Sequence, residues 1–242
     1  MRLPTLSGLI KRRLLVNYRA DPEFVQRLLP KRMRPKVVED VAMVGICLIR
    51  LEGIRPRKMP FLPPVSSENA AHRMAVMVEQ EDAEEEAVYI PRRDTDSVIN
   101  HMVGGRLFPG EHHLADFSVR DQDGEIEFAM KARDGGVEVR VRATETTEFP
   151  ASSRFGDLAA ASAFFETGSR GYSDNKRKSC YDCMDLAVRD WRVSALDVSE
   201  VSSSYFEDTA RFPPGTIEFD HALLMRDIKH EWHSAPALTL HS

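Results

Sequence analysis

The chain has 242 residues, of which 42% are hydrophobic and 29% are charged, and its formal net charge is -5. This composition suits a globular domain, and the arginines are spread among acidic residues, so no basic surface for nucleic acid is expected. No apolar run approaches the roughly 20 residues that cross a bilayer, and three cysteines are too few for a disulfide framework. We therefore expect a cytoplasmic protein without a signal peptide that binds neither nucleic acid nor membrane.

The first predicted elements are a strand over residues 12–20 and a short helix over residues 22–29. Apolar and polar side chains alternate along this strand, which places two sets on opposite faces: Leu14, Val16 and Tyr18 against Arg13, Leu15, Asn17 and Arg19. Asp21 is a favourable helix cap, and Pro22 suits the first helical position. Pro30 then ends the helix.

Most of the remaining chain is predicted to form short strands. They cover residues 34–39, 41–54, 70–79, 87–90, 125–132, 137–148, 170–174, 180–187 and 191–201. A second helix is predicted over residues 155–165, and residues 202–233 are expected to be a short helical turn with irregular chain. About ten strands with two or three short helices favour a barrel or a sandwich. We expect one domain over residues 1–242, with residues 202–242 as an extension packing on it.

The stretch from residue 94 to residue 119 is the first candidate for chemistry. Capping residues at 94–97 predict a helix whose apolar side chains are Val98, Ile99 and Met102, and two glycines end it. The turn at residues 108–110 is followed by a strand, and a Glu-His-His cluster stands at the entrance of that strand.

This cluster consists of Glu111, His112 and His113. A carboxylate beside an imidazole can exchange protons with a carbonyl substrate near neutral pH. Because side chains alternate along a strand, Glu111 and His113 share one face, and we predict that they form the inward, catalytic pair. The alternative is that all three are ordinary exposed residues.

Three pieces of the chain together resemble the acetoacetate decarboxylase superfamily. They are residues 17–35, the strand at 71–79 with its partner at 87–90, and the helix, turn and strand at 94–119. The closer likeness is to an uncharacterised bacterial branch, through Arg73, residues 94–97, residues 106–108, and Glu166 with residues 170–172. The resemblance covers most of residues 10–200. It implies a mainly β fold: a closed barrel with peripheral short helices, an internal small-molecule cavity and a homo-oligomer.

The resemblance also implies substrate-binding residues. Arg19 matches the arginine that holds the acid group of the substrate in the decarboxylases, and a guanidinium suits a carboxylate. Arg73 and Arg106 are the other two predicted substrate-binding residues. The alternative for Arg19 is a structural ion pair with Glu68, Glu79 or Glu111.

The decarboxylases carry two adjacent lysines after the Tyr-Pro of this turn, and one of them forms a Schiff base with the substrate. The matching positions here are Gly110 and Glu111, and neither is an amine. We therefore expect no Schiff-base decarboxylation and no cofactor.

Two further hypotheses compete with a lysine-independent lyase, hydratase or isomerase that acts on a small organic acid or carbonyl compound. One is a non-catalytic small-molecule-binding protein. The other is a zinc-stapled module formed by Cys180, Cys183, His230 and His233, but the spacing of this set is poor for zinc. We therefore predict no metal site.

Overall fold

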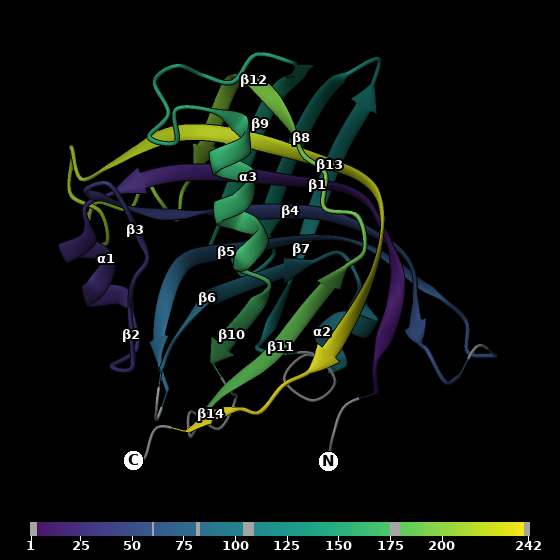
Figure 1. The fold of residues 1–242 in the computed structure, drawn as a ribbon. Coiled ribbons are helices and arrows are strands. Elements are labelled where there is room, and N and C mark those ends of the chain that lie inside the picture. The colour runs from purple at the N-terminus through teal and green to yellow at the C-terminus, as the bar shows by residue number, and fades with distance from the viewer. Residues whose placement is uncertain (1–3, 60, 81–82, 104–108, 175–179, 240–242) are drawn as a thin grey trace.

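The computed structural model describes residues 4–59, 61–80, 83–103, 109–174 and 180–239, and these are mainly β (Figure 1). The strands are β1 Leu6–Ala20, β2 Met33–Pro35, β3 Val37–Val38, β4 Val41–Pro56, β5 Val65–Glu79, β6 Glu84–Thr95, β7 His112–Gln122, β8 Glu125–Ala132, β9 Glu138–Thr146, β10 Arg170–Asp174, β11 Cys180–Val188, β12 Ser194–Ser203, β13 Ile217–Ser234 and β14 Leu238–Thr239. The helices are α1 Pro22–Leu28, α2 Val98–Val103 and α3 Leu158–Thr167.

Nine strands close into a barrel in the order β6-β7-β8-β9-β12-β13-β1-β4-β5, and pairing of β5 with β6 completes the circuit. The mainly β, closed-barrel fold expected from the sequence is therefore confirmed. Large apolar side chains fill the barrel, among them Leu14, Ile46, Met74, Phe128 and Leu224. Removal of this apolar surface from water is the main stabilisation of the barrel.

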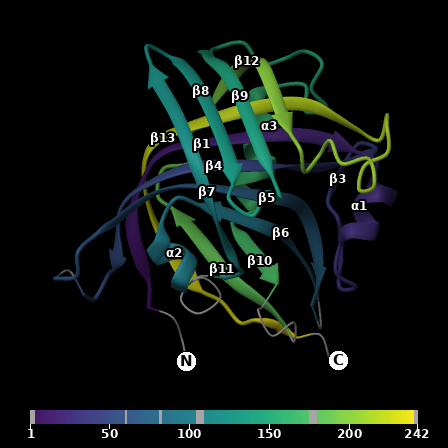
Figure 2. The same cartoon turned by 180° about the vertical axis from the view of Figure 1, so that it is seen from behind.

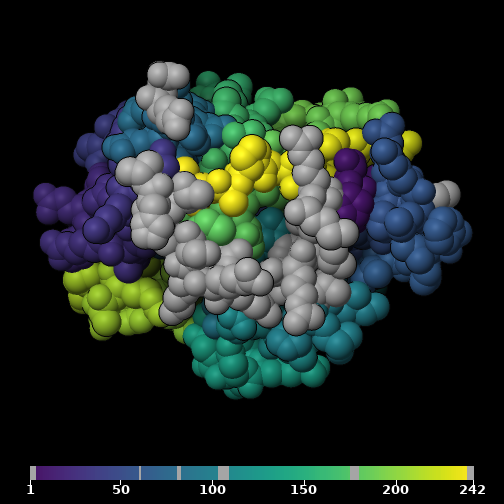
Figure 3. Space-filling view, turned by 90° about the horizontal axis from the view of Figure 1, so that it is seen from below, coloured from purple at the N-terminus to yellow at the C-terminus, as the bar shows by residue number. Residues whose placement is uncertain are grey.

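A second enclosed space uses the opposite face of some of the same strands. The β10–β11 hairpin bridges β6 and β13, because β10 pairs with β6 and β11 pairs with β13. We call the space bounded by β6, β10, β11, β13, β1, β4 and β5 the side chamber. Helix α3 stands against the shared strands on the side seen in Figure 1, whereas β7, β8 and β9 lie on their opposite side, which faces the viewer in Figure 2. Figure 3 shows the molecule from below, where β11 lies beside the end of β13.

Side-chain hydrogen bonds cap the starts of α1 and α3, and α3 begins at Leu158, three residues later than predicted. The Asp21 side chain accepts a hydrogen bond from the Glu23 amide at the start of α1, as predicted. The Asp157 side chain accepts one from the Ala160 amide at the start of α3. These bonds satisfy amides that have no partner inside the helix.

The prediction of irregular chain over residues 202–233 is wrong. Most of this segment is β13, which runs from Ile217 to Ser234 and pairs with β1, β11 and β12. The expected C-terminal extension therefore contributes a strand to the barrel itself. The register between β1 and β13 shifts at Asn17, where Asp220 forms a bulge, so side chains do not alternate regularly along β13.

Helix α2 forms where the sequence predicts a helix, but the three apolar side chains named in that prediction are exposed. Val98, Ile99 and Met102 are each at least half exposed. In the part of the chain that the structure describes, no helix is long and apolar enough to cross a membrane.

Candidate functional site

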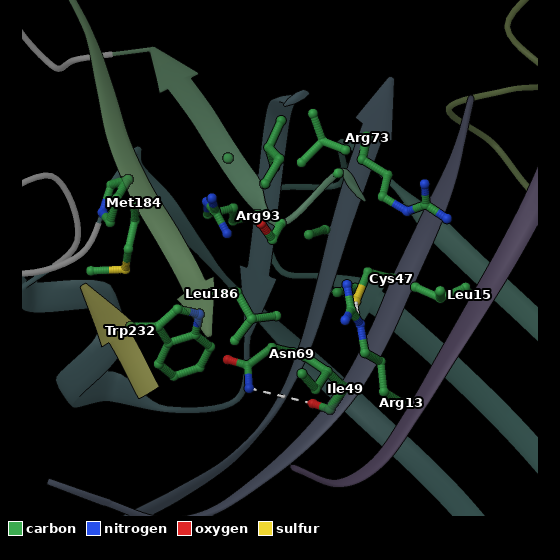
Figure 4. A pocket seen from close by; sticks show the side chains of 18 of the residues that line it. Arg13, Leu15, Cys47, Ile49, Asn69, Arg73, Arg93, Met184, Leu186 and Trp232 are labelled. Carbon is green, nitrogen blue, oxygen red and sulfur yellow. Dashed lines mark hydrogen bonds between the residues drawn. The ribbon is translucent and has the colours of Figure 1, made fainter. Parts of the chain in front are cut away.

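A cavity of about 160 Å³ lies in the side chamber. Every strand of the chamber except β10 contributes side chains to the wall of the cavity, and so does the end of α3 (Figure 4). Strand β10 contributes the backbone of Gly171. A space of this size holds about ten water molecules, or an organic molecule with roughly as many non-hydrogen atoms.

The wall of the cavity is mostly apolar. Open space remains beside β5 because two of the β5 side chains that face the cavity are only methyl groups. Ala71 and Ala75 line the cavity on β5, and Ile49 and Leu51 line it on β4. Trp232 of β13 stands across the chamber, beside Leu186 and Met184 of β11 (Figure 4).

Three arginines reach this apolar space: Arg13 from β1, Arg73 from β5 and Arg93 from β6 (Figure 4). Arg73 is only 4% exposed. Burial lowers the pKa of Arg73 to about 10 and that of Arg93 also to about 10. Both side chains therefore remain cations at neutral pH, inside a wall that is largely hydrocarbon.

The described partners of these cations are neutral. Arg73 donates a hydrogen bond to Asn17 Oδ1 and packs over the ring of Phe165, with 4.8 Å to the ring centroid. Arg93 Nε donates to Ser173 Oγ at 3.2 Å. Within the described ranges, no carboxylate forms an ion pair with Arg13, Arg73 or Arg93.

The neighbouring Arg92 shows what a paired arginine looks like on the same strand. It donates to Asp94 Oδ1 at 2.7 Å and to Asp134 Oδ1 at 2.9 Å. The Asp94 side chain is fully buried, and it also borders the cavity. The carboxylate nearest the chamber is thus occupied by Arg92, and Arg93 is left without one among the described residues.

A glycine lets Arg73 reach Asn17 across the intervening strand. Gly45 of β4 is paired with Asn17 on one side and with Arg73 on the other. A Cβ atom at Gly45 would lie 2.2 Å from the carbonyl oxygen of Val16, far inside van der Waals contact. The absence of a side chain at this position therefore allows the two flanking side chains to meet.

A buried hydrogen-bond chain continues from Asn17, and its polarity follows from the donor at its start. Arginine can only donate, so the oxygen of Asn17 faces Arg73, and its nitrogen faces His221 Nε2 at 3.0 Å. Nε2 must then accept, and the proton of His221 sits on Nδ1, which donates to Asp220 Oδ1 at 2.5 Å. We call Arg73, Asn17, His221 and Asp220 the polar chain.

The bulge in β13 makes the end of this chain possible. It turns two consecutive side chains, Asp220 and His221, toward the same side of the sheet. Burial raises the pKa of Asp220, but hydrogen bonds from His221 and Ser153 outweigh it and bring the value to about 2. Burial also lowers the pKa of His221, so a neutral imidazole donates to an ionised carboxylate.

The structure brings His112, and not its two neighbours, to the cavity. His112 is buried and lines the chamber, and burial lowers its pKa to about 3. Glu111 is exposed, and His113 Nδ1 lies 3.0 Å from Asp134 Oδ2. The orientation of the cluster is therefore opposite to the one predicted. A catalytic role for Glu111 and His113 stays a prediction.

The three predicted substrate-binding arginines have different positions. Arg73 lines the cavity. Arg19 does not; it pairs with Glu218 and with Asp220, at the far end of the polar chain. Arg106 lies outside the described residues. Of the two that the structure describes, Arg73 is therefore the one placed where it could touch a ligand in this cavity.

Gly110, one of the two positions matched to the decarboxylase lysines, has no room for a long side chain. Gly110 has a φ of +75°, and a Cβ atom there would lie 2.7 Å from the Cβ of Ser173. Lys36 is the lysine among the described residues that line the cavity, and it is tied to Glu86 at 2.7 Å. For the zinc hypothesis, the described residues contain no group of three or more potential ligands close enough to hold a metal ion.

Sequence reasoning missed Arg13, Arg93 and Cys47 as cavity residues. For Arg13 the signal was present, because the alternation in residues 12–20 put it on the same face as Leu15 and Asn17. For Arg93 no pattern distinguished it from the adjacent Arg92. Cys47 lies in a strand that reads as continuously apolar.

The chain belongs to the DUF2071 family, whose model is described as an uncharacterized conserved protein and matches residues 10–218. The comparison with curated protein sequences found no match.

Solved structures share the fold at low sequence identity. An acetoacetate decarboxylase from Legionella pneumophila has a TM-score of 0.62 and 10% identity, over 99% of this chain and 88% of that one. An acetoacetate decarboxylase-like enzyme from Sphingomonas wittichii has a TM-score of 0.61 and 15% identity, over 98% and 92%. The enduracididine biosynthesis enzyme MppR, complexed with pyruvate, has a TM-score of 0.60 and 14% identity, over 98% and 91%. The chain thus has an acetoacetate decarboxylase-like fold.

Proposed function

We propose that the side chamber binds a small organic acid, and that Arg73 and Arg93 hold its carboxylate. The observation that carries this proposal is the presence of two guanidinium groups in one apolar cavity, that of buried Arg73 and that of half-buried Arg93, with no carboxylate partner among the described residues. Taking an ion out of water costs several kcal/mol unless a counter-ion accompanies it. An anionic ligand would supply that counter-ion, and guanidinium groups bind carboxylates with directed, charge-assisted hydrogen bonds.

The chemistry of the wall narrows the ligand to a compact acid with an apolar or carbonyl-bearing body. About ten non-hydrogen atoms fit the volume, and most of the wall offers only hydrocarbon. The structural neighbour MppR was solved with pyruvate, a 2-oxo acid. This supports a 2-oxo acid or a related carbonyl acid as the class to examine first.

Turnover, if the protein is an enzyme, would not use the Schiff-base route. Gly110 cannot carry a side chain without displacing Ser173, and Lys36 is held by Glu86. A lysine-independent lyase or isomerase and a non-catalytic binder both remain consistent with the chamber. They differ in whether the bound acid is converted.

The test is a thermal-shift screen of small 2-oxo, hydroxy and unsaturated acids on the wild type, Arg73→Met and Arg93→Met. An acid present at about a hundred times its Kd should stabilise the wild type by about 2.7 kcal/mol. We expect the shift to disappear in both variants, and to persist in Arg120→Gln, which alters an exposed arginine on β7. Product analysis with any acid that binds then separates an enzyme from a binder.

A chamber that binds no acid, or that binds one equally well without Arg73 and Arg93, would contradict the proposal. Neutral analogues with the carboxylate replaced by an amide serve as ligand controls. They should bind at least about tenfold more weakly, since the loss of one charge-assisted contact is worth about 1.5–3 kcal/mol.

A further inference from the structure

Cys47 occupies the middle of the chamber wall. Its residue is 8% exposed, and it lines the cavity from β4. It is paired with Leu15 on β1 and with Ala71 on β5, and Ala71 is in turn paired with Arg93 on β6. One small side chain therefore separates the sulfur from Arg93 along a row that crosses the sheet, in which strands lie about 4.8 Å apart.

The sulfur is in contact with a cation. Arg13 Nε donates to Cys47 Sγ at 3.2 Å, and the other described hydrogen bond of the Arg13 side chain goes to the sulfur of Met225 at 3.9 Å. Figure 4 shows the Arg13 guanidinium beside the Cys47 side chain. Cysteine sulfur is a nucleophile, and Arg13 places a positive charge against it.

The other two arginines also lie within electrostatic range of this sulfur. The Cys47 sulfur partly offsets the lowering of the pKa that burial causes at both Arg73 and Arg93. Arg73, moreover, keeps a buried Nε–H that has no hydrogen-bond partner among the described residues. A nucleophilic atom and unsatisfied carboxylate-binding groups thus share one cavity.

We propose that Cys47 is the nucleophile of the side chamber and adds to the carbonyl carbon of a bound 2-oxo acid. This inference rests on the proposed function, because the arginines must first hold the carboxylate. In the step, a bond forms between Sγ and the carbonyl carbon while the carbon–oxygen π bond breaks. Its electron pair moves to the oxygen, which takes the proton that the thiol gives up. The product is a hemithioketal, and no oxidant or reductant is involved.

The other two cysteines do not share this setting. Cys183 is buried on β11, where burial raises the pKa of its thiol to about 12. Cys180 is half-buried on the same strand and does not line the cavity. They are therefore internal references in any labelling experiment on the whole chain.

The test compares iodoacetate with iodoacetamide on the native protein, with the extent of alkylation at each cysteine read by peptide mass spectrometry. The two reagents differ in charge, and iodoacetate resembles a small carboxylic acid. We expect Cys47 to prefer iodoacetate over iodoacetamide by at least about tenfold, relative to Cys47 in the urea-unfolded chain, which corresponds to about 1.4 kcal/mol of attraction. Arg13→Gln and Arg93→Met should abolish the preference, and Arg120→Gln should keep it.

Two results overturn the inference. One is a native Cys47 that neither reagent labels while the protein is folded. The other is labelling with the same reagent preference as in the unfolded chain. If acids still stabilise Cys47→Ser in an Arg73- and Arg93-dependent manner, the proposed function survives the loss of the nucleophile. If no acid binds to any variant, both proposals fail.

A second readout detects the adduct directly. Pyruvate labelled with ¹³C at its carbonyl carbon serves as the probe, and the carbon signal is followed by NMR. With the wild type we expect a protein-bound signal in the tetrahedral region, and with Cys47→Ser we expect bound pyruvate to keep its carbonyl signal. Bound pyruvate that shows only a carbonyl signal with the wild type would also overturn the inference.

Discussion

The two faces of β5 border two different kinds of interior. On the barrel face lie Met74, Val76 and Val78, which are packed among other large apolar side chains. On the chamber face lie Ala71, Arg73 and Ala75, which leave a cavity with a charge in its wall. The same backbone therefore supports a filled core on one side and a hollow, charged space on the other.

The two interiors differ in how much their packing stabilises the fold and in how much room they leave for a ligand. A filled apolar interior stabilises the fold and offers no room for a ligand. The side chamber is less densely packed and has charged groups in its wall. Both features cost stability unless a bound ligand fills the space and supplies a counter-ion. Four predictions test this contrast, from the largest expected effect to the smallest.

The adjacent arginines of β6 should respond in opposite ways to the same substitution. Arg92→Met removes the partner of the fully buried Asp94, and should cost about 3–5 kcal/mol of unfolding free energy. Arg93→Met removes an enclosed charge with no described carboxylate, and should leave stability unchanged or raise it by about 1–4 kcal/mol. Urea unfolding of both variants without ligand measures this. Equal destabilisation by the two variants would mean that the protein itself neutralises Arg93.

Acid should destabilise the fold through histidines on both sides of the shared strands. Burial lowers the pKa of His72, inside the barrel, to about 3, and that of His112, at the chamber, also to about 3. Burial lowers the pKa of His230 to about 4. The unfolded chain binds these protons near pH 6.5 and the folded chain does not, so stability is complete above that pH and falls below it.

Three such groups should together remove about 4 kcal/mol between pH 7.5 and pH 5.5. Urea midpoints across this range measure the loss. His72→Phe should reduce the slope by about one third, because it deletes one of the three protonation steps. An unchanged slope in this variant would show that His72 can be protonated without unfolding.

A smaller side chain on the barrel face of β5 and a larger one on its chamber face should show which of the two interiors is already filled. Met74→Ala opens a void in the barrel and should cost about 2–5 kcal/mol. Ala75→Leu points into the cavity and should cost less than about 1 kcal/mol, because overpacking is costly only where the space is already filled. The second variant should also abolish acid binding in the thermal-shift screen. A large loss of stability from Ala75→Leu would contradict an open chamber.

The smallest expected effect on stability is at Ser153, which contacts the end of the polar chain. Ser153→Ala removes the hydrogen bond to Asp220 Oδ1 at 2.6 Å and should cost about 1 kcal/mol. Acid affinity should hardly change, because Asn17 still holds Arg73. Asn17→Ala should instead weaken acid binding by about tenfold, since ordering a free arginine side chain costs about 1–2 kcal/mol. Equal affinities for the two variants would show that Asn17 does not position Arg73.

The sequence alone predicted much of the local structure. The alternation in residues 12–20, the cap at Asp21, and the hairpin over residues 125–148 each correspond to an observed element. Strand β13 escaped prediction because the Asp220 bulge interrupts its alternation and because residues 222–225 are buried on both faces. Periodicity is informative only where the register is unbroken and one face meets water.

What the sequence determined is therefore which side chains share a face, since that depends on neighbouring residues and the two-residue period of a strand. It placed Arg13 with Leu15 and Asn17, and it marked Arg73 as a candidate ligand residue. Only the tertiary structure decided which face encloses the cavity, because closure depends on β10 and β11 bridging β6 and β13 across long sequence separations. The meeting of Arg73 with Asn17 across Gly45, and of Arg13 with Cys47, depends on strand registers that no local pattern encodes.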